Sequence, residues 1–278
     1  MKSIGIALGR FYNAHLIGGI IALVSIVVFS IMGLLALPHV NPLKVNAYDP
    51  NLGPNLVNLL GTNALGRDMF TGILLSTLNS LTIGTIGAGI GVMIGVLAGS
   101  IAAFFSGKFD SVLRVLTDTF LVIPMLPVMI LIGSILRWTV PIMGVSFVIF
   151  TWAWTSRTIR SQILSLRRRD FIELARLSGM SETKILFIEI FPHLIPWILS
   201  SLIYAIMWVM INETGLSFLG LGPSNDLTFG MIIYWAFKYG SLYRGIWWAW
   251  VPAIIMLVLI FVSLYTISVG FDKISRGT

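Results

Sequence analysis

Side chains that could do chemistry are few in this sequence, and they are widely scattered. Glu213 is the one acidic residue deep in a long apolar stretch, where a carboxylate is costly and must pair, face water or be protonated. The three histidines (His15, His39 and His193) lie far apart in the sequence, and cysteine is absent. We therefore expect neither a metal site nor thiol chemistry. An intramembrane enzyme would need a nucleophile with a base, or several metal ligands, and no such set is visible.

Two roles remain open for Glu213. Its carboxyl group could face a pore or a gate, as ionisable groups within membranes often do. It could instead form hydrogen bonds that hold Thr214-Gly215 and the loop that follows. For Arg67-Asp68 we expect a structural role, as a pair at the start of a helix that fixes an outside loop to the rest of the protein, rather than a substrate site.

ATP binding through a phosphate-binding loop is excluded by the sequence. The pattern G-x-x-x-x-G-K-[ST] occurs nowhere, and Gly107-Lys108 is followed by Phe109 and lacks the preceding glycine. If ATP drives this protein, ATP and Mg²⁺ must be bound by partner subunits. We therefore expect no cofactor in this chain.

Composition identifies the solvent around most of the chain as lipid. Hydrophobic residues make up 57% and charged residues 10% of the sequence, and the mean hydropathy is +0.95; soluble domains carry about 25% charged residues. The long continuous apolar runs lack the alternation of barrel strands, so the spans must be helices. The net charge of +7 clusters beside these runs, which argues against nucleic acid as a partner. No cleavable signal peptide is evident.

Six stretches are long enough to cross a bilayer as helices, at about 1.5 Å per residue through about 30 Å of hydrocarbon. The third of them is interrupted by Pro124 and Pro127. The six expected spans are Ile17–Leu37, Leu81–Phe105, Phe120–Leu136, Ile142–Thr158, Trp197–Phe218 and Trp248–Gly270.

The distribution of Lys and Arg predicts the orientation. With a cytosolic N-terminus, thirteen of these residues lie inside and five outside, so both termini should be cytosolic in a multi-pass protein of the plasma (inner) membrane. The expected organisation is a cytosolic segment 1–16, a first transmembrane helix 17–37, an extracytoplasmic loop 38–80 with a helix-like stretch at Asp68–Leu78, a five-helix core 81–270 that includes a cytosolic loop 159–196, and a cytosolic tail 271–278.

Glycines recur every three or four residues along the second expected span, at Gly84, Gly87, Gly91, Gly95 and Gly99. This spacing places them on one helix face, where small residues let two helices approach closely in lipid. We expect a tightly packed helix pair here, or a helix that slides against its neighbour during gating.

The cytosolic loop carries its own helix signals. Asp170 is expected as the N-cap of a helix over Phe171–Ser178, with Glu173 completing a capping box and Gly179 ending the helix. Ser181 should cap a second helix over Glu182–Phe191, ended or kinked by Pro192. The arginine run 167–169 is by default an anchor to anionic lipid.

The first of these helices is expected to expose an unusual amount of apolar surface. Its apolar residues are Phe171, Ile172, Leu174, Ala175 and Leu177. Two interpretations stay open on the residues alone. The helix could enter a hydrophobic groove of a cytosolic partner, or it could pack on its own bundle or lie in the lipid interface.

Three separated motifs, in order, resemble a known family. Glu173-Leu174-Ala175-Arg176 with Gly179 and Pro192 is similar to the "EAA" loop of ABC importer permeases. The stretch Leu60–Asp68, LGTNALGRD, resembles the L-G-T-D-x-L-G-R-D signature of the dipeptide, oligopeptide and nickel permease branch, and Glu213–Gly222, ETGLSFLGLG, resembles its E-A-x-L-S-F-L-G-L-G. The matches cover most of the chain from the first span onward.

The resemblance implies an all-α, six-helix type I ABC importer permease with a MetI-like bundle and a cytosolic coupling helix. Such a subunit pairs with a second homologous permease and two cytosolic ABC ATPases, and receives solute from an extracytoplasmic binding protein. The residues that correspond to ATPase coupling are Asp170, Phe171, Ile172, Glu173, Leu174, Ala175, Arg176 and Gly179. Those of the extracytoplasmic or gate motifs are Gly61, Thr62, Gly66, Arg67, Asp68, Glu213, Ser217 and Gly220.

The solute is expected to be an oligopeptide or a similar small molecule, with oligosaccharides or nickel as alternatives within the family. A secondary transporter is the alternative class, supported only by Glu213 and the Pro124/Pro127 interruption. Leu174 replaces the first alanine of the EAA motif, Ile188-Glu189 replaces Arg-His, and His193 replaces the asparagine after the final proline. Contacts made by those family residues therefore do not carry over.

Overall fold

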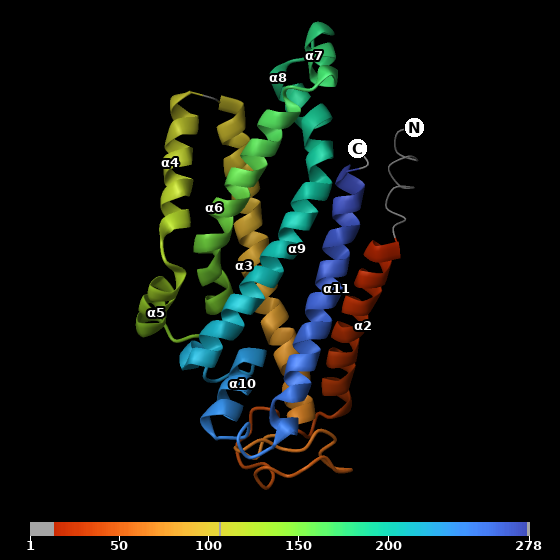
Figure 1. Cartoon of the computed structure of the whole chain (residues 1–278), viewed down its shortest axis with the longest axis vertical. Coiled ribbons are helices and arrows are strands. Elements are labelled where there is room, and N and C mark those ends of the chain that lie inside the picture. Colours follow the sequence, from red (N-terminus) through yellow and green to blue (C-terminus); the bar gives the residue numbers. More distant parts are fainter. Residues whose placement is uncertain (1–13, 106, 277–278) are drawn as a thin grey trace.

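A computed structural model describes residues 14–105 and 107–276 and shows an elongated bundle of helices (Figure 1). Within these residues there is no strand, only an isolated bridge between Thr62 and Asp68. The prediction of an all-helical protein is therefore confirmed for the described chain. Residues 1–13 of the expected N-terminal segment and 277–278 of the expected tail lie outside it.

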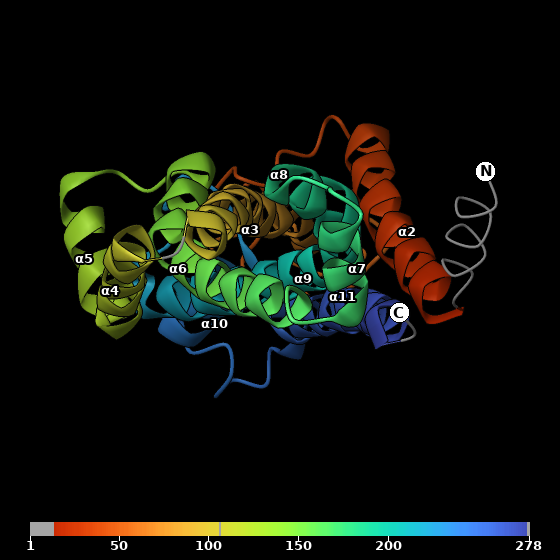
Figure 2. The same cartoon turned by 90° about the horizontal axis from the view of Figure 1, so that it is seen from above.

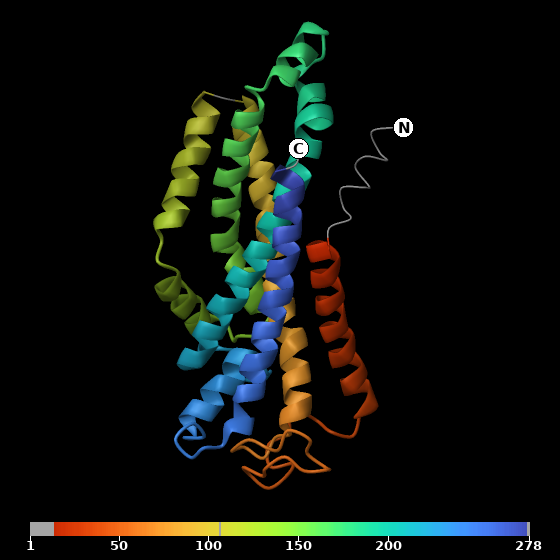
Figure 3. The ribbon, with the colours of Figure 1, turned by 45° about the vertical axis from the view of Figure 1, so that its right-hand side comes forward.

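Five long helices run along the length of the bundle (Figures 1 and 3). They are α2 (Ala14–Ala36), α3 (Met69–Phe105), α6 (Val140–Leu166), α9 (Phe191–Leu216) and α11 (Val251–Arg276). The end view shows α4 and α5 along one edge of the bundle and α2 at the opposite edge (Figure 2). The short helix α7 stands at one end, and the connection between α2 and α3 lies at the other.

Four helical segments of the described chain are long and apolar enough to cross a membrane, and a bent pair would make a fifth. The segments are Ala14–Ala36, Met69–Phe104, Glu182–Leu221 and Val251–Ile274. The expected count of six is therefore not confirmed. The fourth expected span lies within α6, which carries several Thr, Ser and Arg residues and packs against α3, α4 and α9. Neighbouring helices can thus shield its polar side chains.

The third expected span, Phe120–Leu136, is wrong as a single helix. The chain forms α4 (Lys108–Val122) and α5 (Met125–Ile135), which meet at an angle of 81°. Ile123 is extended, with φ −63° and ψ 122°, because the ring of Pro124 disfavours a helical conformation in the residue before it. The proline thus sets the position of the bend.

The second expected span and the helix-like stretch expected before it belong to one helix. α3 is one helix of 37 residues that starts at Met69, so Asp68–Leu78 does not form a separate outside element. Polar residues in this part of the helix, such as Ser76, Thr77 and Ser80, are buried within the bundle.

Most of the expected cytosolic loop 159–196 is helical. α6 continues to Leu166, followed by α7 (Asp170–Leu177), α8 (Glu182–Lys184) and the π-helical turn η1 (Ile185–Ile190), which runs into α9. Pro192 neither ends nor breaks the helix. It lies in the first turn of α9, directly after the π-helical turn, and the chain stays helical on both sides of it.

Beyond α9 the chain forms three short helical elements before the last long helix. They are η2 (Ser217–Leu221), α10 (Phe229–Lys238) and η3 (Trp247–Ala249). Residues 217–250 thus lie mostly at the end of the bundle opposite α7 (Figure 1). α11 continues as helix to Arg276, so the expected tail 271–278 is not a separate segment as far as it is described.

Candidate functional site

The start of α7 differs from its prediction. Arg169 occupies the N-cap position with an extended backbone, and Asp170 is the first helical residue rather than the cap. No side chain caps this end by a hydrogen bond, so the expected capping box is wrong. Asp170 and Glu173 still lie in the first turn, where negative charge interacts favourably with the helix dipole.

The end of α7 forms as the glycine indicates. Gly179 has a φ of 81°, and its N–H donates to the Arg176 carbonyl oxygen at 2.9 Å. The N–H of Met180 donates to the Ala175 carbonyl oxygen at 3.1 Å. This pair of bonds is a Schellman motif, which favours glycine because the position is left-handed. Ser181 caps the next helix, accepting from the Lys184 N–H at 3.4 Å.

α7 presents two different apolar faces. Ile172 is fully buried and Ala175 nearly so, within a cluster that also contains Val92 of α3 and Ile159 of α6. Leu174 and Leu177 are 64% and 81% exposed. The expectation that all five apolar residues would be free is therefore wrong, because the inner face packs on the bundle itself. Two large leucines of α7 remain uncovered. This helix stands at one end of the bundle (Figure 1).

A basic hollow of about 480 Å³ adjoins these leucines. It is lined by Arg167, Arg168, Arg169, Glu173, Arg176 and Leu177. The α7 end thus combines an apolar tip with a largely cationic flank, a surface suited to a partner that offers apolar and acidic groups together.

The motif over residues 61–68 forms a compact polar turn at the opposite end. Asp68 Oδ1 accepts from the Thr71 N–H at 2.8 Å and from the Thr71 hydroxyl at 2.9 Å, so Asp68 caps α3. Its Oδ2 accepts from Asn58 Nδ2 at 2.9 Å. Burial lowers the pKa of the nearby Arg67 guanidinium below its usual range. Asp68 thus lies at the start of a helix, as expected of the Arg67-Asp68 pair, and within the described chain Arg67 forms no ion pair with it.

Two glycines and a threonine fix the course of this turn. Gly61 and Gly66 have φ values of 68° and 66°, and a Cβ atom at either position would overlap a backbone carbonyl oxygen. The Thr62 hydroxyl donates to the Asp49 carbonyl oxygen at 2.7 Å, and Trp248 Nε1 donates to the Thr62 carbonyl oxygen at 3.2 Å. The bond from Trp248 thus holds the turn against η3, which precedes α11.

Glu213 lies in a buried polar cluster that joins three elements. Its Oε1 accepts from the Ser217 hydroxyl at 2.7 Å and its Oε2 from the Ser80 hydroxyl at 3.4 Å. Ser80 also accepts from the Phe229 N–H at 3.3 Å, at the start of α10. All four residues are fully buried. The carboxyl group therefore connects α9, α3 and α10. Gly220, with a φ of 83°, turns the chain beside the ring of Tyr234.

The glycine face of α3 lies against α6. A Cβ atom on Gly91 would overlap the Thr151 hydroxyl, and one on Gly99 would overlap the Ser156 carbonyl oxygen. Gly87 and Gly95 face the same helix at a similarly close approach. The Thr151 hydroxyl donates to the Gly87 carbonyl oxygen at 2.9 Å. This hydrogen bond between the two helices is possible only because the glycines bring them together.

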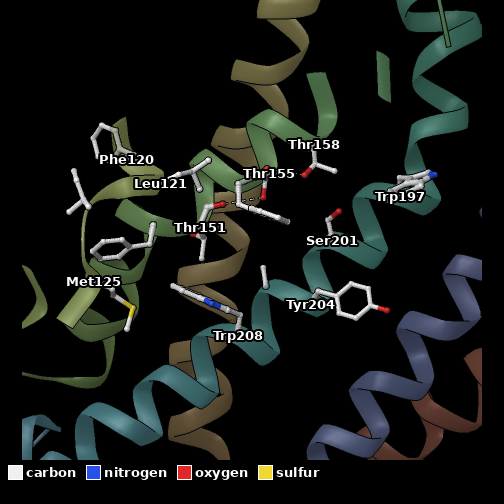
Figure 4. Close-up of a pocket in the computed structure, with 14 residues that line it drawn as sticks. Phe120, Leu121, Met125, Thr151, Thr155, Thr158, Trp197, Ser201, Tyr204 and Trp208 are labelled. Atoms are coloured by element: carbon white, nitrogen blue, oxygen red, sulfur yellow. Dashed lines mark hydrogen bonds between the residues drawn. The ribbon is translucent and has the colours of Figure 1, made fainter. Parts of the chain in front are cut away.

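A chamber of about 690 Å³, not anticipated from the sequence, opens between α4, α6 and α9 (Figure 4). Three threonines of α6 (Thr151, Thr155 and Thr158) face aromatic residues of α9, including Trp208. The lining contains Phe120, Leu121, Ile123, Met125, Phe150, Thr151, Trp154, Thr155, Thr158, Trp197, Ser201, Tyr204, Ala205 and Trp208. None of these side chains is an acid, a lysine, an arginine or a histidine.

A sequence signal for the chamber existed. Trp197, Ser201, Tyr204 and Trp208 recur every three or four residues and so share one face of α9. The three α6 threonines follow the same spacing. The two prolines indicate an interruption of the third expected span, but they do not indicate that α4 and α5 lie beside these faces and form the third wall of the chamber.

Comparison with known proteins identifies the family. Residues 91–274 match the family described as "Binding-protein-dependent transport system inner membrane component". The oligopeptide transport system permease protein OppC of Lactococcus lactis subsp. cremoris is 28% identical over 241 residues, covering 84% of this chain and 81% of the relative. OppC of Mycobacterium tuberculosis H37Rv is 31% identical, covering 71% and 70%.

Further matches agree with this result. The nickel transport system permease protein NikC of Escherichia coli K12 is 28% identical, covering 71% of this chain and 73% of the relative. A chain of the MetNI methionine ABC transporter in an inward-facing conformation shares the fold, with a TM-score of 0.60 at 15% identity, and covers 75% of this chain and 97% of its own. The protein therefore belongs to the family of inner-membrane components of binding-protein-dependent ABC importers, in the branch that includes the oligopeptide and nickel permeases.

Proposed function

We propose that this permease component forms a membrane pathway together with a second homologous permease, and that two cytosolic ABC ATPases drive it through α7. An extracytoplasmic binding protein would deliver the solute at the opposite end. The observation that carries the proposal is the two-sided character of α7: its inner face is built into the bundle, and its outer face leaves Leu174 and Leu177 exposed. Burying such a leucine contributes about 1.5–3 kcal/mol.

The coupling can be stated as a shift between two conformations. ATP bound to the partner subunits changes the equilibrium of this chain only through contacts that differ between the two states. α7 offers such contacts because the cluster under Ile172 joins it to α3, α6 and α9. A displacement of α7 would therefore be passed to the helices that line the chamber. ATP and Mg²⁺ stay on the partner subunits in this scheme.

Acidic substitution of the exposed leucines tests this surface. The double variant Leu174→Asp, Leu177→Asp should lower co-purification of the ATPase subunits at least tenfold, because two apolar contacts are lost and two charges are introduced. The permease itself should accumulate normally, since both side chains point away from the bundle. The matched control is Leu56→Asp, a 98% exposed leucine at the opposite end. Unchanged ATPase binding by the double variant would refute α7 as the docking element.

We infer that the chamber between α4, α6 and α9 forms part of the solute pathway. Its aromatic and hydroxyl lining can contact apolar and hydrogen-bonding groups, as ligand pockets commonly do. It lacks the carboxylate and imidazole groups that bind nickel well, which makes nickel the poorest fit. An oligopeptide or a similar organic solute suits the lining, and the tryptophans together with Thr155 and Ser201 also suit an oligosaccharide. A secondary transporter would instead require ionisable groups in such a site.

Removal of a tryptophan from the chamber tests this assignment. Trp154→Ala should reduce ATP-driven uptake into proteoliposomes about tenfold, because one large exposed ring of the lining is lost. A labelled tripeptide and a labelled trisaccharide, each offered with the cognate binding protein, serve as probes. The control is Trp247→Ala, a comparably exposed ring in η3. Equal uptake by Trp154→Ala and the wild type, for whichever probe is imported, would exclude the chamber from the pathway.

A further inference from the structure

Three charged side chains form a bridge beneath α7. Glu182, the first residue of α8, accepts from Arg176 Nε of α7 at 2.7 Å through Oε1. Its Oε2 accepts from Arg167 Nη2, at the end of α6, at 2.8 Å. One carboxylate thus holds guanidinium groups from two helices. The hydrogen bond between Arg176 and Glu182 raises the pKa of the Arg176 guanidinium and lowers the pKa of the Glu182 carboxyl, so this pair favours the charged form of both partners.

The bridge extends to a fourth helix. Arg167 Nη1 donates to the Ala103 carbonyl oxygen of α3 at 2.8 Å. This carbonyl lies in the last turn of α3, where the four terminal carbonyl groups have no partner within their own helix. Arg167 is the least exposed member of the bridge, with 23% of its side chain exposed. Its planar guanidinium has several N–H donors, so it can bind the Ala103 carbonyl oxygen and the Glu182 carboxylate at the same time.

The apolar cluster and the bridge perform different tasks. Ile172 and Ala175 hold α7 on the bundle by apolar contact, which is not directional. The bridge sets an orientation, because its hydrogen bonds fix the end of α7 relative to the ends of α3 and α6. An isolated exposed ion pair would contribute little, whereas a network with shared partners and a two-pronged arginine can hold a geometry.

We propose that Glu182 and Arg167 are positioning residues for energy coupling, which fix α7 to the ends of α3 and α6 so that its displacement moves the helices of the chamber. The inference rests on the proposed function of α7. Arg167 lines the basic hollow beside Leu177, whereas Glu182 does not. Loss of the bridge through substitution of Glu182 should therefore leave ATPase binding intact and weaken the response of the pathway to ATP.

A labelling experiment tests this without knowledge of the solute. The chain has no cysteine, so Ser201→Cys supplies a single thiol in the chamber. The complete complex in proteoliposomes is exposed to an impermeant maleimide from the binding-protein side, with and without ATP and vanadate. ATP should raise the labelling rate at position 201 when Glu182 is intact. In Glu182→Gln this increase should fall about fivefold, while ATPase co-purification stays at the level of the parent.

Matched variants separate the bridge from general effects of charge. Glu189→Gln makes the same chemical change about two helical turns further on, at an acid that forms no ion pair in the described chain, and should keep the full response to ATP. Glu182→Asp keeps the charge and should retain part of the response. If Glu182→Gln responds like the parent, the positioning role is refuted and the proposed function stands. If the parent binds ATPase but shows no response to ATP, or binds no ATPase, the proposed function itself fails.

Discussion

Replacing Gly91 with leucine should prevent α3 and α6 from packing, whereas the same change at Gly89 should be tolerated. A side chain on Gly91 would overlap the Thr151 hydroxyl and would break its hydrogen bond to the Gly87 carbonyl oxygen. Gly89 lies two residues away on the same helix, and a Cβ atom there meets nothing within 4 Å. The two variants therefore share composition and helix propensity but differ in packing.

The expected loss for Gly91→Leu is about 3 kcal/mol in the free energy of unfolding, because overpacking of a tight interface typically costs 1–3 kcal/mol and an interhelical hydrogen bond is lost as well. Gly89→Leu should change it by less than about 0.5 kcal/mol. Denaturant titration of the purified chain in detergent, followed by tryptophan fluorescence, measures both. Equal stability of the two variants would mean that the close contact of α3 with α6 does not hold the bundle together.

Glu213→Leu should destabilise the bundle strongly, whereas Glu213→Gln should be nearly neutral. The leucine variant leaves the Ser217 and Ser80 hydroxyls without their acceptor in a fully buried cluster, at about 1–3 kcal/mol for each unsatisfied group. The glutamine keeps an oxygen acceptor and the shape of the side chain. We expect a loss of about 3 kcal/mol for the first variant and less than about 1 kcal/mol for the second, by the same titration.

The same pair of variants distinguishes the two roles considered for Glu213. If its carboxyl group were part of a gate or an ion pathway, Glu213→Gln would keep its stability but lose the ATP-driven labelling at position 201. The hydrogen bonds to Ser80 and Ser217 predict instead that Glu213→Gln keeps both. Loss of the ATP response in a stable Glu213→Gln protein would contradict the structural role.

Local signals in the sequence predicted some elements well. The first span was placed within a few residues of α2, because nothing in that stretch competes with the apolar signal. The end of α7 at Gly179 was also correct, because a left-handed residue depends on the backbone alone. The predicted start of α7 was wrong. Asp170 is a residue type that favours the N-cap position, but its backbone is helical and Arg169 occupies the N-cap.

Features that depend on neighbouring helices could not be read from local patterns. The extent of α3 is one example, because the expected span began at Leu81 and the helix-like stretch before it was taken as a part of the outside loop. In the structure both belong to one helix, in which Ser76, Thr77 and Ser80 are buried. Pro192 was expected to end or kink the second helix of the cytosolic loop. In the structure a π-helical turn precedes it, and the proline lies in the first turn of α9. The bridge through Glu182 joins residues from four helices and had no sequence signal of its own.

A cross-link from the tip of α7 tests the central claim most directly. Because the chain has no cysteine, Leu174→Cys gives one site for a thiol-directed photo-cross-linker on an exposed position, and Leu56→Cys gives the matched site at the opposite end. In membranes that contain the complete transporter, we expect a covalent product with the ATP-binding subunit from position 174 and none from position 56. Absence of that product from position 174, or its equal formation from both positions, would contradict the assignment of α7 as the element that couples this permease to ATP.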